Sequence, residues 1–135
     1  MGIARLDHYS IRTTDLDSTT KFYTEVLGFT VGPRPNFPFP GVWLYNNGLA
    51  VVHVIGIDPN DSSGLMEYLG GREQSGKGSG MVDHVAFFGD DIAAIRARIQ
   101  ATGSEFKERK VPSLNLEQIF VEDPSGIVVE LNFPT

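Results

Sequence analysis

Cysteine is absent from this chain of 135 residues, and its absence excludes several kinds of chemistry. Without a thiol, the chain forms no disulfide, has no thiolate nucleophile and builds no cysteine-ligated zinc site. Histidine is scarce as well, because His8, His53 and His84 are the only three. Each of these histidines lies in a strand-like stretch of its own.

Positive charge and long apolar runs are also in short supply. The formal net charge is −6 and no basic stripe is present, which excludes the usual electrostatic signature of a nucleic-acid partner. No apolar run approaches the roughly 20 residues that span a bilayer, and the first residues lack the apolar core of a signal peptide. We therefore expect a soluble, cytoplasmic protein without a nucleic-acid or membrane partner.

The stretch 1–55 predicts the order β-α-β-β-β. A helix is indicated from Asp15 to Leu27 by an N-capping residue, apolar spacing and the terminating Gly28. An Asn-Gly turn at 46–48 joins the last two strands. The four strands are expected at 6–12, 29–31, 41–45 and 49–55.

Residues 56–80 differ in composition, being rich in glycine and serine. This stretch is predicted to be a linker loop, with one helical turn at 65–69. A long loop inside a compact domain acts as a spacer, a lid or a bridge between units, and the sequence leaves these alternatives open.

The stretch 81–135 repeats the first plan. A helix is expected from Asp90-Asp91 to Gly103, and a turn at 123–126 joins the last two strands. The chain therefore reads as one domain, 1–135, made of a first module at 1–55, the linker at 56–80 and a second module at 81–135. The expected strands of the second module are 81–88, 105–108, 118–121 and 127–131.

A nearly constant offset in residue number relates the two halves. It is the same for Asp7-His8 with Asp83-His84, for the two helix starts, and for the third strands, Trp43-Leu44 with Ile119-Phe120. The offset is one larger for the last strands, which places one extra residue in a turn. Under this alignment His8 matches His84, and His53 matches Glu130.

Two such modules packed about an approximate two-fold axis would bring the four matched residues together. Three imidazoles and a carboxylate are a reasonable ligand set for a divalent metal. Strand alternation turns Asp7 and Asp83 to the opposite face, which makes them poor candidates for the same ion. The alternative for each histidine alone is an ordinary strand residue satisfied by a neighbour, and for Glu130 a solvent-facing carboxylate.

Nearly the whole chain outside 56–80 resembles the vicinal-oxygen-chelate superfamily, which includes glyoxalase I, fosfomycin-resistance proteins, extradiol dioxygenases and metal-free bleomycin-resistance proteins. The resemblance is carried by four stretches with sequences LDH, FYTEVLGF, VDHVAF and FVEDPSGIVVEL, at 6–8, 22–29, 82–87 and 120–131. It implies an α+β fold of two βαβββ modules related by a pseudo-two-fold axis, forming a curved sheet around a metal site. It also implies a homodimer, in which the site forms within one chain or across two.

The resemblance further implies that His8, His84 and Glu130 bind the metal and that His53 occupies the fourth ligand position. That position is a carboxylate in typical glyoxalase I, so His53 is either a ligand or an acid–base residue, as Glu130 also is. The expected cofactor is one divalent ion: Fe, Ni, Zn, Co or Mn. Two histidines and a carboxylate also match the facial triad of iron(II) oxygenases.

Substrate contacts are predicted less sharply. The proline-rich stretch 33–41 is either a rigid surface turn or, with Phe37, Phe39 and Trp43, the wall of an apolar pocket. Arg12 is a candidate for binding an anionic group of the substrate, although it and Arg109 are also read as surface charges.

The predicted function is that of a glyoxalase-like, metal-dependent enzyme of the lyase or isomerase type. Its small substrate would chelate the metal through neighbouring oxygens. The alternatives are an iron(II) extradiol-type dioxygenase and a non-catalytic binding protein of the bleomycin-resistance type.

Overall fold

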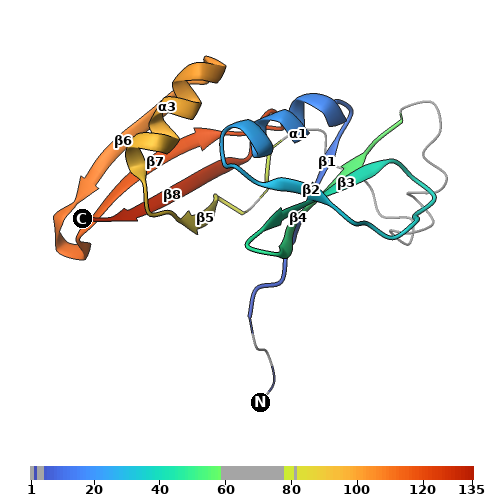
Figure 1. Cartoon of the computed structure of the whole chain (residues 1–135), viewed down its shortest axis with the longest axis horizontal. Coiled ribbons are helices and arrows are strands. Elements are labelled where there is room, and N and C mark those ends of the chain that lie inside the picture. Colours follow the sequence, from blue (N-terminus) through green and yellow to red (C-terminus); the bar gives the residue numbers. More distant parts are fainter. Residues whose placement is uncertain (1, 3–4, 59–77, 81) are drawn as a thin grey trace. The chain divides into compact units, whose positions relative to one another are not determined.

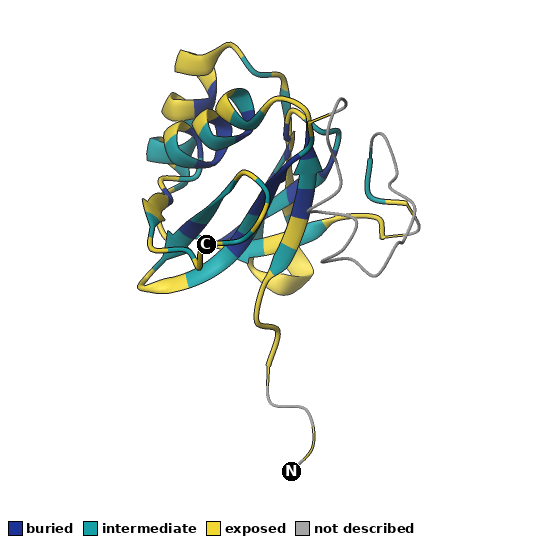
Figure 2. Cartoon of the chain, turned by 90° about the vertical axis from the view of Figure 1, so that its right-hand side faces the viewer, coloured by how far each residue is buried: buried dark blue, intermediate teal, exposed yellow. Residues whose placement is uncertain are grey.

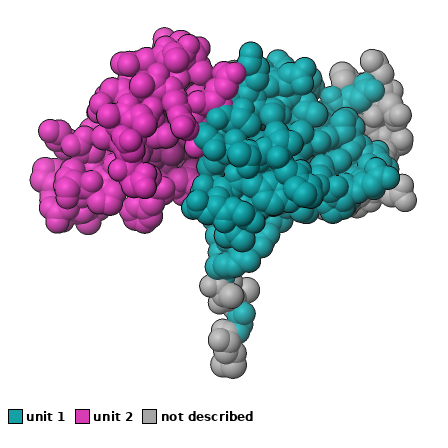
Figure 3. Space-filling view, viewed as in Figure 1, with its two compact units in different colours: residues 1–24, 28–74 teal, residues 25–27, 75–135 magenta. Residues whose placement is uncertain are grey.

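The computed structural model describes residues 2, 5–58, 78–80 and 82–135. Most of the predicted linker at 56–80, including the helical turn predicted at 65–69, lies outside the described residues. The chain divides into two compact units, residues 1–24 with 28–74 and residues 25–27 with 75–135 (Figure 3). None of the described helices is long and apolar enough to cross a membrane.

Unit 1 contains one helix and one mixed sheet (Figure 1). Its four strands are hydrogen-bonded in the order β1-β4-β3-β2, with β1 parallel to β4 and the other pairs antiparallel. The elements in chain order are β1 (Tyr9–Thr13), α1 (Leu16–Glu25), β2 (Thr30–Gly32), β3 (Gly41–Asn46) and β4 (Leu49–Gly56).

Unit 2 repeats this arrangement, with its sheet in the order β5-β8-β7-β6 and β5 parallel to β8. The β-α-β-β-β order predicted for each half is therefore confirmed. The elements are β5 (Val85–Phe88), α3 (Ile92–Thr102), β6 (Phe106–Val111), the short 3₁₀ helix η1 (Pro112–Leu114), β7 (Leu116–Glu122) and β8 (Val128–Pro134).

Both helices begin at an aspartate, as the sequence predicted. The Asp15 carboxylate accepts a hydrogen bond from the Ser18 backbone N–H at 3.0 Å, and Asp91 accepts one from Ala94 at 3.1 Å. These bonds satisfy backbone donors that have no partner within the first turn. Gly103, with φ of 75°, ends the second helix in the left-handed conformation that glycine adopts without strain.

Each sheet has one face packed into a core (Figure 2). Buried residues alternate with more exposed ones in parts of the central strands, as at Val52 and Val54 on β4 and at Val129 and Leu131 on β8. The buried strand residues of unit 1 include Ile11, Leu44, Val52 and Val54, and those of unit 2 include Ile119, Val121, Val129, Leu131 and Phe133.

Strand register confirms the offset that relates the first and last strands. Tyr9 lies opposite Val52, and Val85 lies opposite Val129, so the offset is one larger on the last strand than on the first. The prediction for the third strands was wrong by one residue. Trp43 pairs with His53 and Phe120 pairs with Glu130, so the partner of Trp43 is Phe120 rather than Ile119. The one-residue insertion in unit 2 therefore comes before the third strand, and not in the turn between the third and last strands.

The first strand of each half starts later than predicted, at Tyr9 and Val85. Asp7-His8 and Asp83-His84 therefore precede the strands. Since strand alternation applies only within a strand, the prediction that both aspartates face away from their histidines is wrong.

Candidate functional site

In unit 1 the predicted site residues share one face of the sheet. His53 on β4 lies opposite Ser10 on β1 and opposite Trp43 on β3. Arg12 follows Ser10 by two residues, so alternation places it on the same face. The buried Val52 and Val54 point to the other face, which leaves this one for binding.

Three rings are stacked on this face. The ring centroids of Trp43 and His53 are 3.9 Å apart with an interplanar angle of 9°, and those of His53 and His8 are 3.6 Å apart at 15°. His53 is therefore covered on both sides. Nearly parallel rings direct their in-plane lone pairs side by side, so in this arrangement His8 and His53 do not converge on one ion.

His8 is held by the residue before it. Its Nδ1 donates to Oδ2 of Asp7 at 2.6 Å, and that bond is the main reason why the pKa of Asp7 is lowered. A proton on Nδ1 leaves the lone pair of the neutral ring on Nε2. Carboxylates that hold a histidine this way orient metal ligands in many sites, and Nε2 is the ring nitrogen of His8 that this bond leaves available.

His53 is held differently. Its Nε2 lies 3.1 Å from the carbonyl oxygen of Ala50, which only accepts, so Nε2 carries the proton. Burial lowers the pKa of His53, and the nearby His8 lowers it further. His53 is thus a neutral ring near pH 7, with Nδ1 as its available basic atom.

The aromatic residues predicted as a pocket wall lie in one cluster. Phe37 and Phe39 are stacked at 5.3 Å, and Phe37 is tilted against Trp43 at 6.3 Å. The Arg34 guanidinium lies about 5 Å from both phenylalanine rings and donates to the Phe39 carbonyl. The proline-rich stretch is therefore an ordered aromatic loop that continues the Trp43–His53–His8 stack.

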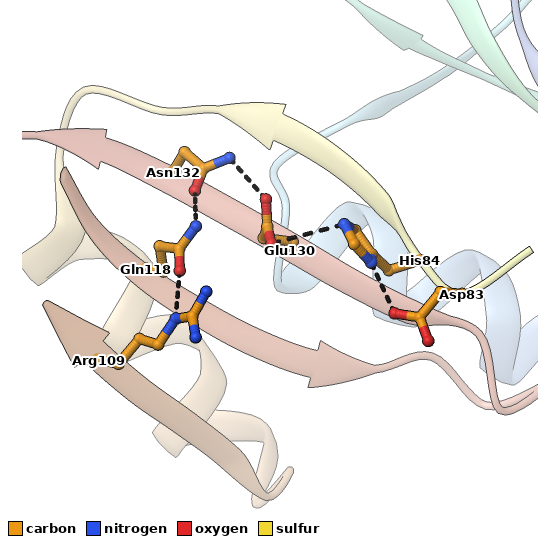
Figure 4. A network of polar contacts seen from close by, with 6 residues as sticks. All are labelled: Asp83, His84, Arg109, Gln118, Glu130 and Asn132. Atoms are coloured by element: carbon orange, nitrogen blue, oxygen red, sulfur yellow. Dashed lines mark hydrogen bonds and ion pairs between the residues drawn. The ribbon is translucent and has the colours of Figure 1, made fainter. Parts of the chain in front are cut away.

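Unit 2 presents its own pair of predicted ligands. Nε2 of His84 lies 3.5 Å from Oε1 of Glu130, whose side chain is only 13% exposed (Figure 4). Nδ1 of His84 donates to Oδ2 of Asp83 at 2.8 Å, and this bond, followed by the charge of Glu130, raises the pKa of His84. In the neutral ring, Nε2 would present a lone pair to a carboxylate oxygen. Two such electron-rich atoms are stabilised by a proton or a cation between them.

Glu130 is the inner end of a chain of polar side chains (Figure 4). Its Oε2 accepts from Asn132 at 2.9 Å, the Asn132 carbonyl accepts from Gln118 at 2.7 Å, and Gln118 accepts from Arg109 at 2.6 Å. Asn132 and Gln118 are buried. Every side chain in this hydrogen-bonded row thus has a partner. Oε1 is the Glu130 oxygen that remains directed toward His84.

The donor set fits a divalent metal in part. A nitrogen and an oxygen each about 2.1 Å from one tetrahedral ion lie roughly 3.4 Å apart, close to the 3.5 Å between His84 and Glu130. His8 offers a matching imidazole, whereas Nε2 of His53 is occupied. Within residues 5–58 and 82–135, no group of three or more histidine, aspartate or glutamate side chains is placed to hold an ion.

A family model described as the Glyoxalase/Bleomycin resistance protein/Dioxygenase superfamily matches residues 5–131. The chain belongs to this superfamily. Its relatives include a probable lactoylglutathione lyase from Vibrio parahaemolyticus, 31% identical, with 97% of this chain and 91% of the relative covered.

Solved structures of the superfamily share the fold at low sequence identity. A variant of the fosfomycin resistance protein FosX from Listeria monocytogenes, complexed with Mn(II) and a dihydroxypropylphosphonic acid, has a TM-score of 0.71 at 19% identity, covering 98% of this chain and 94% of that one. TnmS3, an antibiotic binding protein from Streptomyces sp. CB03234, has a TM-score of 0.66 at 21% identity, covering 100% and 99%. The superfamily fold thus serves both a metal-complexed resistance protein and a binding protein.

The sequence analysis did not select the polar partners of Glu130. Asn132 is two residues beyond Glu130 on the same strand, so alternation alone would have placed the two on one face. Gln118 is a polar residue in an otherwise apolar strand, which is a signal for a buried hydrogen bond. Arg109 was read as a surface charge, and its bond to Gln118 appears only through strand pairing.

A separate hollow of about 990 Å³ lies in unit 2 along β6 and β7. None of the predicted site residues lines it. Phe120 does line it and is also the register partner of Glu130. Phe120 is therefore a further side chain to consider for substrate contact.

Proposed function

We propose that this protein is a metal-dependent enzyme of the superfamily, acting on a small substrate through two neighbouring oxygens. The observation that carries the proposal is the close approach of His84 Nε2 to Oε1 of Glu130, with Asp83 behind the histidine. His8, held in the same way by Asp7, is the proposed third ligand.

A divalent ion bound there would polarise the substrate oxygens and stabilise the negative charge that develops on them. The chain itself supplies the proton-transfer groups. His53 is neutral and offers Nδ1 as a base, and Glu130 is the alternative base if its oxygen is released from the ion. Arg12, on the same sheet face as His53, is proposed to bind an anionic group of the substrate.

The first experiment is metal analysis of protein purified without chelator, followed by titration with Mn²⁺, Ni²⁺, Zn²⁺, Co²⁺ and Fe²⁺. We expect one ion per proposed site and loss of that ion in Glu130→Gln. Glu105→Gln, the same change at an exposed carboxylate of the same unit, is the matched control. Failure of the wild-type protein to bind any of these ions would overturn the proposal.

An iron(II) extradiol-type dioxygenase is the second candidate, supported by the residue types of the proposed ligands, two histidines and one carboxylate. Anaerobic loading with Fe²⁺ followed by oxygen and a series of catechols tests it. Ring cleavage supports the dioxygenase. Equal activity with Zn²⁺ on a substrate that needs no oxygen supports the lyase or isomerase.

A binding protein without catalysis is the third candidate, supported by the aromatic stack and the Phe37–Phe39 pair. Trp43 is the chain's one tryptophan, so its fluorescence reports ligands that insert beside it. Tight binding of a planar aromatic compound by metal-free protein, without turnover when metal is added, would favour this candidate. Homodimer formation and a cytoplasmic location stay predictions.

A further inference from the structure

We infer that Arg109 is a positioning residue that, together with the Glu130 carboxylate itself, fixes the direction of the hydrogen bonds reaching Glu130. This inference rests on the proposed role of Glu130 as a metal ligand and adds the mechanism by which its free oxygen is selected. Arg109, Gln118 and Asn132 lie opposite one another on β6, β7 and β8. They form a row across three strands, and it ends beside Glu130 (Figure 4).

The direction of the row follows from what each group can donate. A guanidinium has no acceptor, so Nε of Arg109 requires the oxygen of the Gln118 amide to face it. The Gln118 nitrogen then faces the Asn132 oxygen, and the Asn132 nitrogen faces Oε2 of Glu130. A side-chain amide can be flipped, exchanging its oxygen and nitrogen, at little intrinsic cost. The carboxylate at the inner end and the cation at the outer end require the same one of the two arrangements.

The opposite arrangement would present the Asn132 oxygen to a carboxylate oxygen. That contact is repulsive, and both groups are largely buried, so water would not compensate for it. The observed direction gives Oε2 a donor and leaves Oε1 directed to His84 Nε2. Arg109 therefore acts on the site from the edge strand without touching any ligand.

The contact between Arg109 and Gln118 uses one N–H only, so an amine can replace it. Arg109→Lys should keep a donor at the outer end of the row, whereas Arg109→Met should leave the Gln118 oxygen without that donor and the row held from one end only. Lys107→Met is the matched control, because Lys107 lies on the same strand and the same sheet face and its loss changes the charge equally.

The experiment measures Mn²⁺ affinity by calorimetry for the four proteins, with thermal melts to establish that each is folded. Direct partners of metal ligands typically change affinity 10- to 100-fold, and Arg109 acts through two amides, so we expect Arg109→Met to weaken binding severalfold, below about 10-fold. Arg109→Lys and Lys107→Met should stay close to wild type. Unchanged affinity in Arg109→Met, equal losses in the Met and Lys variants, or an equal loss in Lys107→Met would each overturn the inference.

A second measurement separates this inference from the proposed function. The side-chain amide signals of Gln118 and Asn132 can be followed by NMR in metal-free protein, with Asn132→Asp to assign one of them. We expect slow hydrogen exchange for both amides in wild type and Arg109→Lys, and faster exchange with shifted signals in Arg109→Met. If wild type binds no ion, the proposed function fails, and unchanged amide signals in Arg109→Met would overturn the inference independently.

Discussion

Equivalent positions in the two units hold different chemistry on the same backbone. In both units, a histidine just before the first strand is held at Nδ1 by the preceding aspartate, in the pairs Asp7–His8 and Asp83–His84. On the last strand the units differ, because unit 1 has His53 where unit 2 has Glu130. His53 lies in an aromatic stack and donates to a backbone carbonyl, whereas Glu130 ends a chain of polar side chains.

This difference shows that the duplicated fold provides equivalent backbone positions for His53 and Glu130. The side chains around each position determine which contacts the residue there makes. Trp43 is the strand partner of His53, so the imidazole can stack on the indole ring. Asn132, two residues beyond Glu130 on the same strand, donates a hydrogen bond to the Glu130 carboxylate. On the proposed function, we expect the His84–Glu130 pair of unit 2 to supply most of the metal affinity.

The largest effect is expected from the last-strand carboxylate. Glu130→Gln should weaken metal binding by more than about 100-fold, beyond the range typical of outer partners, because it removes a charged ligand. Calorimetric titration with Mn²⁺ measures this. The comparison variant is His53→Gln, which introduces the same residue, glutamine, at the equivalent position of unit 1. Equal losses in both variants would contradict the proposal that Glu130, rather than His53, is the main ligand.

The two supporting aspartates should have smaller and matching effects. Asp7→Ala and Asp83→Ala should each lower metal affinity about 10- to 100-fold. In each variant the neighbouring histidine loses the carboxylate that accepts its Nδ1 hydrogen bond and orients its ring. The double variant should lose approximately the product of the two factors. An effect confined to Asp83→Ala would show that His8 is not a ligand.

Replacement of His53 by leucine should change metal affinity by less than the roughly 10-fold lower limit for outer partners. It should instead change the fluorescence of Trp43, because the imidazole lies 3.9 Å from the indole. Emission spectra with and without an aromatic ligand measure this, and Phe88→Leu, at an exposed ring with no proposed role, is a control for a general loss of ring surface. Loss of metal with unchanged fluorescence would contradict our assignment of His53.

The smallest effect concerns the helix starts, which the two units share. Asp15→Ala should lower the melting temperature by roughly 2–6 °C, because the cap of α1 is lost. The hydrogen bond from Ser18 lowers the pKa of Asp15 below its ordinary 3.8. Its contribution is therefore present above that pH and is lost as the pH falls through the lower folded value. Thermal melts of both proteins from pH 7 to pH 2 should converge at the acid end; a constant difference would exclude the carboxylate as the cause.

The sequence by itself determined the element order, the helix starts and the match of His53 with Glu130. These features follow from local patterns and from a repeat with nearly constant spacing, both of which can be read along the chain. Strand ends were less predictable, because a strand continues only while a neighbouring strand supplies hydrogen bonds. Leu6, for example, has a strand-like neighbourhood and is 83% exposed.

Only the tertiary structure decided how the candidate residues are used. The row Arg109–Gln118–Asn132 and the Trp43–His53–His8 stack join residues that are distant in sequence, through strand register and side-chain geometry. A one-residue change in register turns every side chain to the other face, so an offset counted along the chain does not specify these contacts. The sequence therefore named the ligand candidates and placed an aspartate beside His8 and His84. The pairing of strands decided which rings stack on His53 and which amides follow Glu130.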